Sequence, residues 1–327
     1  MFKRQLIGKD AFISSTEPFK NYGKSRQLYV TNTNKDSTGR FVLDKNQEKR
    51  SLFWVDIEAV LSAISDVDKA TVEVSFPVSN YLSDDPEFKV NCHPLTKSFY
   101  ENYGSDVADV SSPVNWQGAT AVEPWTTEGG DYNDAITIPS TFDKQNSIYT
   151  VDLTEFIKTY NPASYHGFIL VADGVNRNFA MYSSESDYAI PYVNIFENTF
   201  SIETGDNVLA FPNNEVPEIL LRSQKYRYHK GETLEVRISL NRKYATKAFE
   251  NSSKQFYSPN LKYRLIDIAR NRLIVDYRDE TRIDVTPAGN ILRLSLDNLL
   301  SGFYEMSIMN DNGILVSFGT MEFKIDG

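Results

Sequence analysis

The stretch LEVRISL, residues 234–240, alternates apolar and polar side chains with the period of a β-strand. Its four apolar side chains fall on one face, which predicts the buried side of a sheet. The same period recurs in VEVSFPV (72–78), ILRLSL (291–296) and YEMSIM (304–309). Only FWVDIEAVLSAI (53–64), which has the composition to begin as a strand, and VDLTEFIKTY (151–160) have helical spacing. The sequence therefore predicts an all-β chain with very little helix.

Turn-forming residues divide this pattern into two blocks. Strand periodicity fades between residues 198 and 217, where Gly, Pro, Asn and Asp are frequent. A length of 327 residues is also typical of two domains. We predict a first domain over 6–200, built as a sandwich or barrel, a linker over 201–214, and an immunoglobulin-like β-sandwich over 215–327.

Charge and cysteine usage exclude several classes of function. The formal net charge is −10, and it lies almost wholly in the first 204 residues. An acidic chain repels phosphate backbones and anionic membranes, so we expect neither nucleic acid nor a membrane as partner. Cys92 is the only cysteine, which excludes an intrachain disulfide and a zinc site built on several thiolates.

The ends and the apolar runs of the chain bear on its location. The opening MFKRQLIGKDAFI lacks the apolar run of a secretory signal. No stretch approaches the roughly 18 apolar residues that a transmembrane helix requires. We therefore expect the protein to stay where it is made, unless it leaves as part of a larger particle.

Catalytic and cofactor motifs are absent from the sequence. There is no metalloprotease, hydrolase, phosphate-loop or dinucleotide signature, and the three histidines are widely separated. Cys92 and His93 are adjacent, so on a strand they face opposite ways and cannot form a nucleophile–base pair. We expect no enzymatic activity and no cofactor. Carboxylates are abundant, however, so a glycosidase or lyase remains a third alternative to the two readings below.

Calcium is the one metal that the residue types allow. Asp10, Asp131 and Asp134, together with loop carbonyls, could supply the hard oxygen ligands that this ion prefers. No EF-hand spacing accompanies them, so the calcium site is a hypothesis carried by residue type alone.

The segment PVNWQGATAVEPWTTEGGDYND, residues 113–134, concentrates aromatic and turn residues outside any alternating strand. One interpretation makes Trp116, Trp125, Asp131 and Tyr132 a binding surface for a sugar or a protein partner. The alternative is that both indoles close the end of the core. The Gly129–Gly130 pair predicts a sharp turn with positive φ that aims Asp131 and Tyr132.

Landmarks across the first 195 residues resemble one known family. DAFI (10–13), NYG (21–23) and LYV (28–30) are similar to the "DAYV…NYG…LYVG" opening of DNRLRE-type domains, jelly-roll-like modules of secreted carbohydrate-binding proteins and of phage particles. Further landmarks follow in the family's order: RSLFWVDI (50–57), VNW (114–116), YTVDLTEFIKTY (149–160), GFILV (167–171), MYSSES (181–186) and PYVNI (191–195). The resemblance implies a jelly-roll-like β-sandwich for 6–200.

The chain departs from this family at Ile190, where the family has Arg, and at Gln117-Gly118, where it has Asn-Asn. These positions border the loops that a ligand would use, so the resemblance bears more on the fold than on sugar binding.

The later part of the chain resembles a C-terminal sandwich of tailed-phage structural proteins. The resemblance lies in LLRSQKYRYHKGETLEVRISLNRKYATKAF (220–249), YRLIDIARNRLIVDY (263–277), FYEMSIM (303–309) and FKI (323–325). The segment WTTEGGDY (125–132) is also similar to phage versions of the first domain.

These resemblances imply a non-enzymatic structural component of a bacteriophage virion. It would be a capsid, neck, tail or fibre-attachment protein that docks to other virion proteins in a multi-copy symmetric assembly. The alternative is a carbohydrate-binding or adhesion module that recognises a surface glycan through Trp116, Trp125 and Tyr132. The expected location is the virion, after synthesis in the host cytoplasm.

Overall fold

The prediction of an all-β chain is confirmed by a computed structural model, which is 54% strand and 8% helix. The structure describes residues 2–33, 47–83, 89–101, 114–120, 122–173, 177–197, 200–206, 208–212, 215–223, 225–242, 255–311 and 316–327. The chain divides into two compact units. The first unit is Gln5–Asn194, and the second unit combines Met1–Arg4 with Ile195–Gly327.

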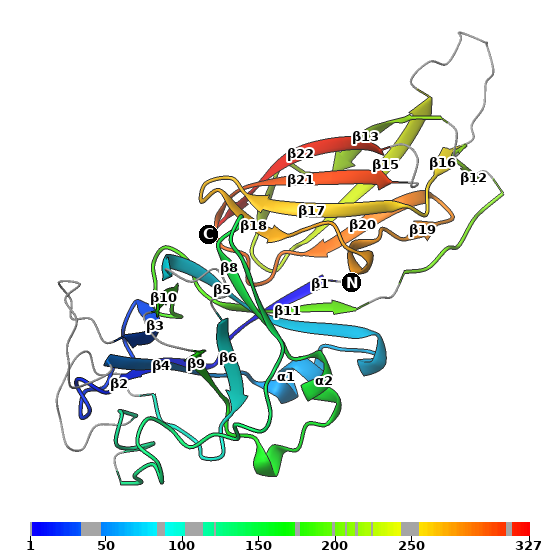
Figure 1. Cartoon of the computed structure of the whole chain (residues 1–327). Coiled ribbons are helices and arrows are strands. Elements are labelled where there is room, and N and C mark those ends of the chain that lie inside the picture. Colours follow the sequence, from blue (N-terminus) through cyan, green and yellow to red (C-terminus); the bar gives the residue numbers. More distant parts are fainter. Residues whose placement is uncertain are drawn as a thin grey trace. The chain divides into compact units, whose positions relative to one another are not determined.

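The strands of the first unit belong to one curled sheet (Figure 1). Its hydrogen-bonded path runs β1-β11-β5-β10-β3-β4-β9-β6, while β2 pairs with β4 and the β7–β8 hairpin joins through β5. Two of these strands, β1 (Phe2–Leu6) and β11 (Tyr192–Glu197), cross the division between the units. The others are β2 (Lys9–Ser14), β3 (Gln27–Thr33), β4 (Gln47–Trp54), β5 (Ala70–Ser83), β6 (Lys89–Pro94), β7 (Ser140–Asp143), β8 (Ile148–Asp152), β9 (Phe168–Asp173) and β10 (Arg177–Tyr182).

Helices are short and lie where the sequence predicts them. The segment predicted as helix over 53–64 begins as the end of β4 and becomes α1 (Ile57–Ser62). Asp56 caps α1, because its carboxylate accepts the backbone N–H of Ala59 at 2.9 Å. The second predicted helix is α2 (Thr154–Lys158). Single 3₁₀ turns occupy Val67–Lys69, Pro162–Ser164 and Asp279–Thr281.

A four-stranded and a five-stranded sheet make up most of the second unit. The first has the order β13-β15-β20-β19 and the second β14-β22-β21-β17-β18, while β12 and β16 form a small parallel pair. The strands are β12 (Val208–Ala210), β13 (Pro217–Ser223), β14 (Arg227–His229), β15 (Thr233–Arg242), β16 (Gln255–Tyr257), β17 (Leu261–Asp267), β18 (Arg272–Val275), β19 (Val285–Thr286), β20 (Gly289–Ser295), β21 (Gly302–Asp311) and β22 (Val316–Asp326).

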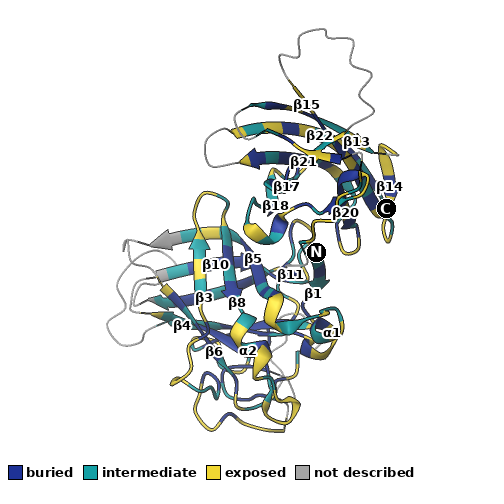
Figure 2. Cartoon of the chain, turned by 90° about the vertical axis from the view of Figure 1, so that its right-hand side faces the viewer, coloured by how far each residue is buried: buried dark blue, intermediate teal, exposed yellow. Residues whose placement is uncertain are grey.

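The core of the second unit follows the sequence alternation. Leu234, Val236, Ile238 and Leu240 are all buried on the inner face of β15, and they alternate with residues of intermediate or full exposure along this strand (Figure 2). Inward side chains of β17, β20, β21 and β22 complete one apolar cluster with them. Burial of alternate apolar side chains between two sheets therefore stabilises this unit.

The beginning of the chain is built into this same core. Phe2 is 3% exposed, belongs to the apolar cluster of the second unit, and packs its ring 5.2 Å from that of Phe196. Arg4 is buried, and its guanidinium donates to the carbonyl of Ile274 at 3.1 Å. The second unit therefore needs both ends of the sequence.

The division of the chain differs from the predicted boundaries of 6–200, 201–214 and 215–327. The segment 201–214, predicted as a linker, contains β12, and Phe211 within it joins the core of the second unit. The sequence does not reveal that this segment belongs to the second unit, because a three-residue strand and a single buried ring are too short to show a strand period among turn residues. Residues 207, 213 and 214 lie outside the described residues.

Candidate functional site

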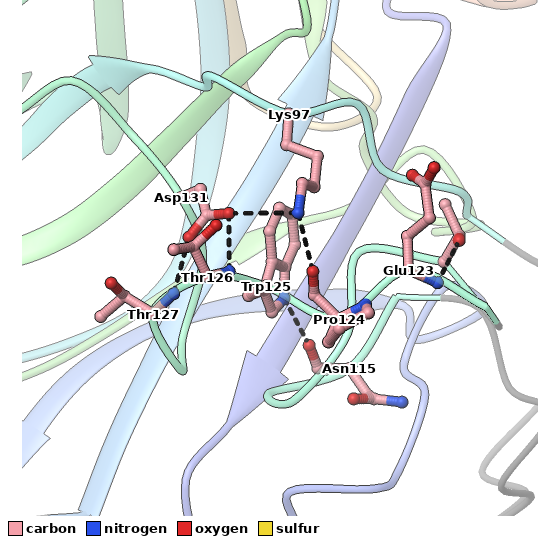
Figure 3. Close-up of polar contacts among 9 residues, drawn as sticks. Lys97, Asn115, Glu123, Pro124, Trp125, Thr126, Thr127 and Asp131 are labelled. Carbon is pink, nitrogen blue, oxygen red and sulfur yellow. Dashed lines mark hydrogen bonds and ion pairs between the residues drawn. The ribbon is translucent and has the colours of Figure 1, made fainter.

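Residues 114–120 and 122–134 of the first unit fold into a layer of turns, which we call the loop layer. Asn115 organises its first turn: the side-chain oxygen accepts the backbone N–H of Gln117 at 2.8 Å and of Gly118 at 2.9 Å. The carbonyl of Asn115 accepts the indole N–H of Trp125 at 2.9 Å (Figure 3). These bonds satisfy polar groups that burial would otherwise leave unpaired, so they fix one conformation. Pro113 and Ala121 of the predicted segment lie outside the described residues.

Both predicted tryptophans are core residues. Trp116 is 7% exposed and Trp125 is 5% exposed. They share an apolar cluster with Leu52, Ile169 and other side chains from β2, β4 and β9, and Tyr132 packs against it. The two indoles therefore close the core, as the alternative interpretation predicts. Neither of them offers a ring face to a ligand. The binding role of the loop layer as a whole stays a prediction.

The predicted glycine turn is confirmed. Gly129 and Gly130 have φ values of 88° and 108°, a region that residues with a Cβ rarely adopt. A Cβ on Gly129 would lie 2.7 Å from the ring of Trp116, and one on Gly130 would lie 2.9 Å from the Ile169 side chain. The turn therefore lets the backbone lie directly on the core before it leads into Asp131.

Asp131 holds the turn that precedes it. Its two carboxylate oxygens accept the backbone N–H groups of Thr126 and Thr127, both at 2.8 Å (Figure 3). The ammonium of Lys97 lies 3.5 Å from the same carboxylate and donates to the carbonyl of Pro124 at 2.8 Å. Burial alone would raise the pKa of Asp131, but the backbone donors and Lys97 outweigh it and lower the pKa. Asp131 is therefore an ionised structural carboxylate.

An open pocket of about 520 Å³ lies over this turn. Arg50 lies at its base: its guanidinium donates to Glu48 at 2.7 Å and to the carbonyl of Gly129 at 2.9 Å, and it lies over the rings of Trp116 and Tyr132. The lining residues are Arg50, Thr96, Lys97, Thr126, Thr127, Gly130, Asp131, Tyr132 and Asp134.

The charges that line this pocket are largely compensated within the unit. Arg50 has Glu48 as its ion-pair partner, and Lys97 has Asp131. The exposed carboxylate of Asp134 is left for a ligand, whereas the side chain of Thr126 hydrogen-bonds to Asp131. Such a surface suits recognition by hydrogen bonds and shape.

Of the four predicted binding residues, Asp131 and Tyr132 line the pocket, whereas the two tryptophans belong to the apolar cluster. The tyrosine ring lies 5.2 Å from that of His93. Sequence reasoning missed Arg50 and Lys97, which enter from other segments. No local pattern could reveal them, because residues 50 and 129 lie far apart in the sequence and meet only in the folded chain.

The three calcium candidates have different surroundings. Asp131 is engaged by backbone donors, and Asp134 is exposed at the pocket rim. Asp10 is 1% exposed and accepts the backbone N–H of Ser184 at 2.7 Å. Among the residues that the structure describes, no group of three or more His, Cys, Asp or Glu side chains is placed to hold a metal ion. Calcium binding remains untested.

Burial shifts the titration of Asp10 and its neighbour Glu101. Removal from water raises the pKa of Asp10 to about 7, against the hydrogen bond from Ser184 and together with the charge of Glu185. Burial and the charge of Asp10 raise the pKa of Glu101 to about 8. One oxygen of Asp10 has no hydrogen-bond partner among the residues that the structure describes. This carboxyl is therefore held neutral over much of the range below pH 7.

Comparisons with known proteins leave the family open. No protein-family model matches the chain, and no curated protein matches it. A DUF4785 family protein from Legionella pneumophila is 10% identical, with 99% of this chain and 63% of that protein covered and a TM-score of 0.21.

Two β-glucuronidase structures are similar at the same low level. That from Parabacteroides merdae is 10% identical over 85% of this chain and 28% of its own, with a TM-score of 0.20. A calcium-binding mutant of β-glucuronidase 2 from Bacteroides uniformis is 7% identical over 99% and 32%, with a TM-score of 0.23. The chain spans less than two thirds of the length of each of these three proteins. Similarity this weak carries no argument about function.

Within the described residues, no helix has the length and apolarity to span a bilayer.

Proposed function

We propose that this chain is a non-enzymatic structural protein of a bacteriophage particle, and that it docks to other protein chains through the loop layer. The observation that supports this proposal best is the construction of that layer. Two buried indoles, the Asn115 turn and the Asp131 turn hold it in one conformation, and a rigid surface binds a partner at low entropic cost. The virion setting comes from the sequence resemblance.

The loop layer also presents apolar groups to solvent. Val122 is 86% exposed, and Tyr100, whose backbone N–H donates to Ala119 of the layer, is 53% exposed. Glu123 and Glu128 add negative charge beside them. A partner surface with apolar anchors and a basic rim would complement this arrangement.

The test has two levels. Mass spectrometry of purified particles should detect the chain at a fixed copy number, and chemical cross-linking should join the loop layer to a second virion protein. Val122→Asp should lower incorporation at least tenfold, because it places a charge where an apolar anchor docks. Val316→Asp is the matched control, since Val316 is 49% exposed in the second unit.

The two levels fail separately. Absence of the chain from particles would contradict the virion role. Normal incorporation of Val122→Asp, with the chain present, would contradict docking through the loop layer and leave the virion role standing.

Recognition of a surface glycan is the second candidate function. The burial of Trp116 and Trp125 removes two of the three rings to which the sequence analysis assigned it and leaves Tyr132, so this function requires further exposed aromatic residues. A different pocket of the first unit supplies them.

A further inference from the structure

A second pocket of the first unit, of about 380 Å³, lies where β10 ends beside the start of β3. Tyr182, the last residue of β10, pairs with Gln27, the first residue of β3. The chain before β3 and the turn after β10 complete the pocket. Its lining residues are Ser25, Arg26, Gln27, Tyr182, Ser186, Asp187 and Tyr188. None of them belongs to the loop layer or to its pocket.

Hydrogen bonds hold the two segments together. The backbone N–H of Ser183 donates to the carbonyl of Arg26 at 3.2 Å, and the hydroxyl of Ser183 donates to the carbonyl of Ser25 at 2.5 Å. The hydroxyl of Ser186 accepts the backbone N–H of Tyr188 at 3.2 Å. The buried carboxyl of Asp10 accepts the N–H of Ser184 from below. These hydrogen bonds therefore preorganise the pocket.

Two tyrosines form its aromatic side. The rings of Tyr182 and Tyr188 lie 5.3 Å apart at an interplanar angle of 39°. Tyr188 is 58% exposed, so a large part of its ring is in contact with solvent. A tyrosine ring in this position offers apolar area together with a hydroxyl, which suits a ligand that is itself both apolar and hydroxylated.

An exposed ion pair forms the polar side. The guanidinium of Arg26 lies 2.9 Å from the carboxylate of Asp187, and the two side chains are 73% and 80% exposed. Pairs as exposed as this contribute little to stability, so the pair is available for another role. It presents charged donors and acceptors side by side with no net charge. A ligand that both donates and accepts hydrogen bonds would use both partners at once.

We propose that this pocket binds a neutral saccharide. The C–H face of a pyranose ring packs on Tyr188, and neighbouring sugar hydroxyls donate to Asp187 and accept from Arg26. The compensated charge gives a neutral sugar an advantage over an anionic or cationic one. The volume lies at the lower end of the range of about 300–1,000 Å³ for small-molecule sites, as a terminal sugar unit requires. The inference rests on the second candidate function, recognition of a surface glycan, and does not depend on the virion role or on docking through the loop layer.

Saturation-transfer NMR on the full chain tests the proposal with three neutral disaccharides, lactose, maltose and cellobiose, as probes. At least one should receive saturation, with a dissociation constant on the order of 1 mM. Tyr188→Ala and Arg26→Ala should each weaken that binding roughly tenfold, because each removes one side of the pocket. Tyrosine and tryptophan fluorescence should show that both variants remain folded.

Two matched variants separate this site from general surface effects. Tyr226→Ala removes a tyrosine of similar exposure, 52%, and Lys69→Ala breaks an exposed ion pair with Asp66 at 2.8 Å. Both should leave the dissociation constant unchanged. The proposal is overturned if none of the three sugars receives saturation at about 10 mM, a concentration that would nearly fill a 1 mM site. It is also overturned if Tyr132→Ala in the other pocket abolishes binding while Tyr188→Ala does not.

Discussion

The two units differ in what closes their cores. In the second unit most buried apolar residues lie on strands, and the alternation of β15, β17 and β21 buries them in register. In the first unit most members of the cluster around Trp116 and Trp125 come from turns, including Leu95 and Phe99. A strand core is thus specified by a period, whereas a loop core is specified by individual contacts and by glycines that allow close approach. Substitutions should therefore destabilise the two units for different physical reasons.

The sharpest test of this difference is Trp125→Ala. It should destabilise the first unit by roughly 3–5 kcal/mol, because it leaves a cavity in the core and removes the donor to the Asn115 carbonyl. Urea unfolding followed by tryptophan fluorescence measures it, since all three tryptophans lie in the first unit and two remain in the variant. Trp116→Ala should behave similarly.

Tyr100→Ala serves as the control, with an expected change within about 0.5 kcal/mol at this exposed position. A loss below about 1 kcal/mol for Trp125→Ala would contradict closure of the core by the loop layer and return the indoles to the candidate binding surface.

The second unit is best tested at its N-terminal strand. Phe2→Ala should destabilise that unit by roughly 3 kcal/mol, because Phe2 is buried against Phe196 in its core. Hydrogen exchange of β13 and β15 should accelerate, while the tryptophan fluorescence transition of the first unit stays in place. Leu6→Ala is the control, since Leu6 is 51% exposed. Unchanged exchange in β15 would show that the second unit folds without the start of the chain.

The same contrast explains which features of the fold and of the candidate site could be predicted from the sequence alone. The alternation of LEVRISL placed the inward residues of β15 correctly, and the spacing over 151–160 located α2. The Gly129–Gly130 pair indicated a positive-φ turn. The burial of Trp116 and the insertion of Phe2 into the second unit depend on contacts between distant segments, which no local period encodes. For the same reason, the sequence alone did not predict the part that Arg50 plays in one pocket or the existence of the pocket lined by Tyr188.

Substitution of Gly319, a glycine between the two sheets of the second unit, should have a smaller effect on stability. A Cβ on Gly319 would lie 2.8 Å from the side chain of Ile219 and 2.9 Å from its carbonyl oxygen, so β22 passes close to β13 only because this position has no side chain. Gly319→Ala should cost about 1–3 kcal/mol through overpacking. In a double-mutant cycle, Ile219→Ala should relieve part of that cost. If hydrogen exchange of β22 shows that the effects of Gly319→Ala and Ile219→Ala on stability are additive, the predicted coupling between these two positions is wrong.

The smallest expected effect is a difference in pH dependence between the units. Burial raises the pKa of Asp10 from its ordinary value of 3.8 to about 7, so the folded first unit holds a proton that the unfolded chain releases. The resulting stability is fully present below pH 3.8 and is lost as the pH rises through 7. Through Asp10 alone, acidification from pH 8 to pH 6 should therefore stabilise the first unit by roughly 1–1.5 kcal/mol, and Glu101 adds stability in the same direction.

The shifted carboxyls of the second unit act in the opposite direction and in another range. Partners Lys225, Lys262 and Lys324 lower the pKa values of Glu232, Asp279 and Asp326, so their stabilisation is present at neutral pH and is lost only in acid. Between pH 6 and pH 8, the urea midpoint of the first unit, measured by tryptophan fluorescence, should thus fall as the pH rises. The stability of the second unit, measured by hydrogen exchange in β21 and corrected for the intrinsic exchange rate, should stay constant. Asp10→Asn should lower the slope of stability against pH, whereas Asp66→Asn, at an exposed cap, should leave it unchanged. A first unit that gains stability as the pH rises from 6 to 8 would show that Asp10 is ionised in the folded chain, and that the loop it anchors beneath Tyr188 is held by a charged rather than a neutral carboxyl.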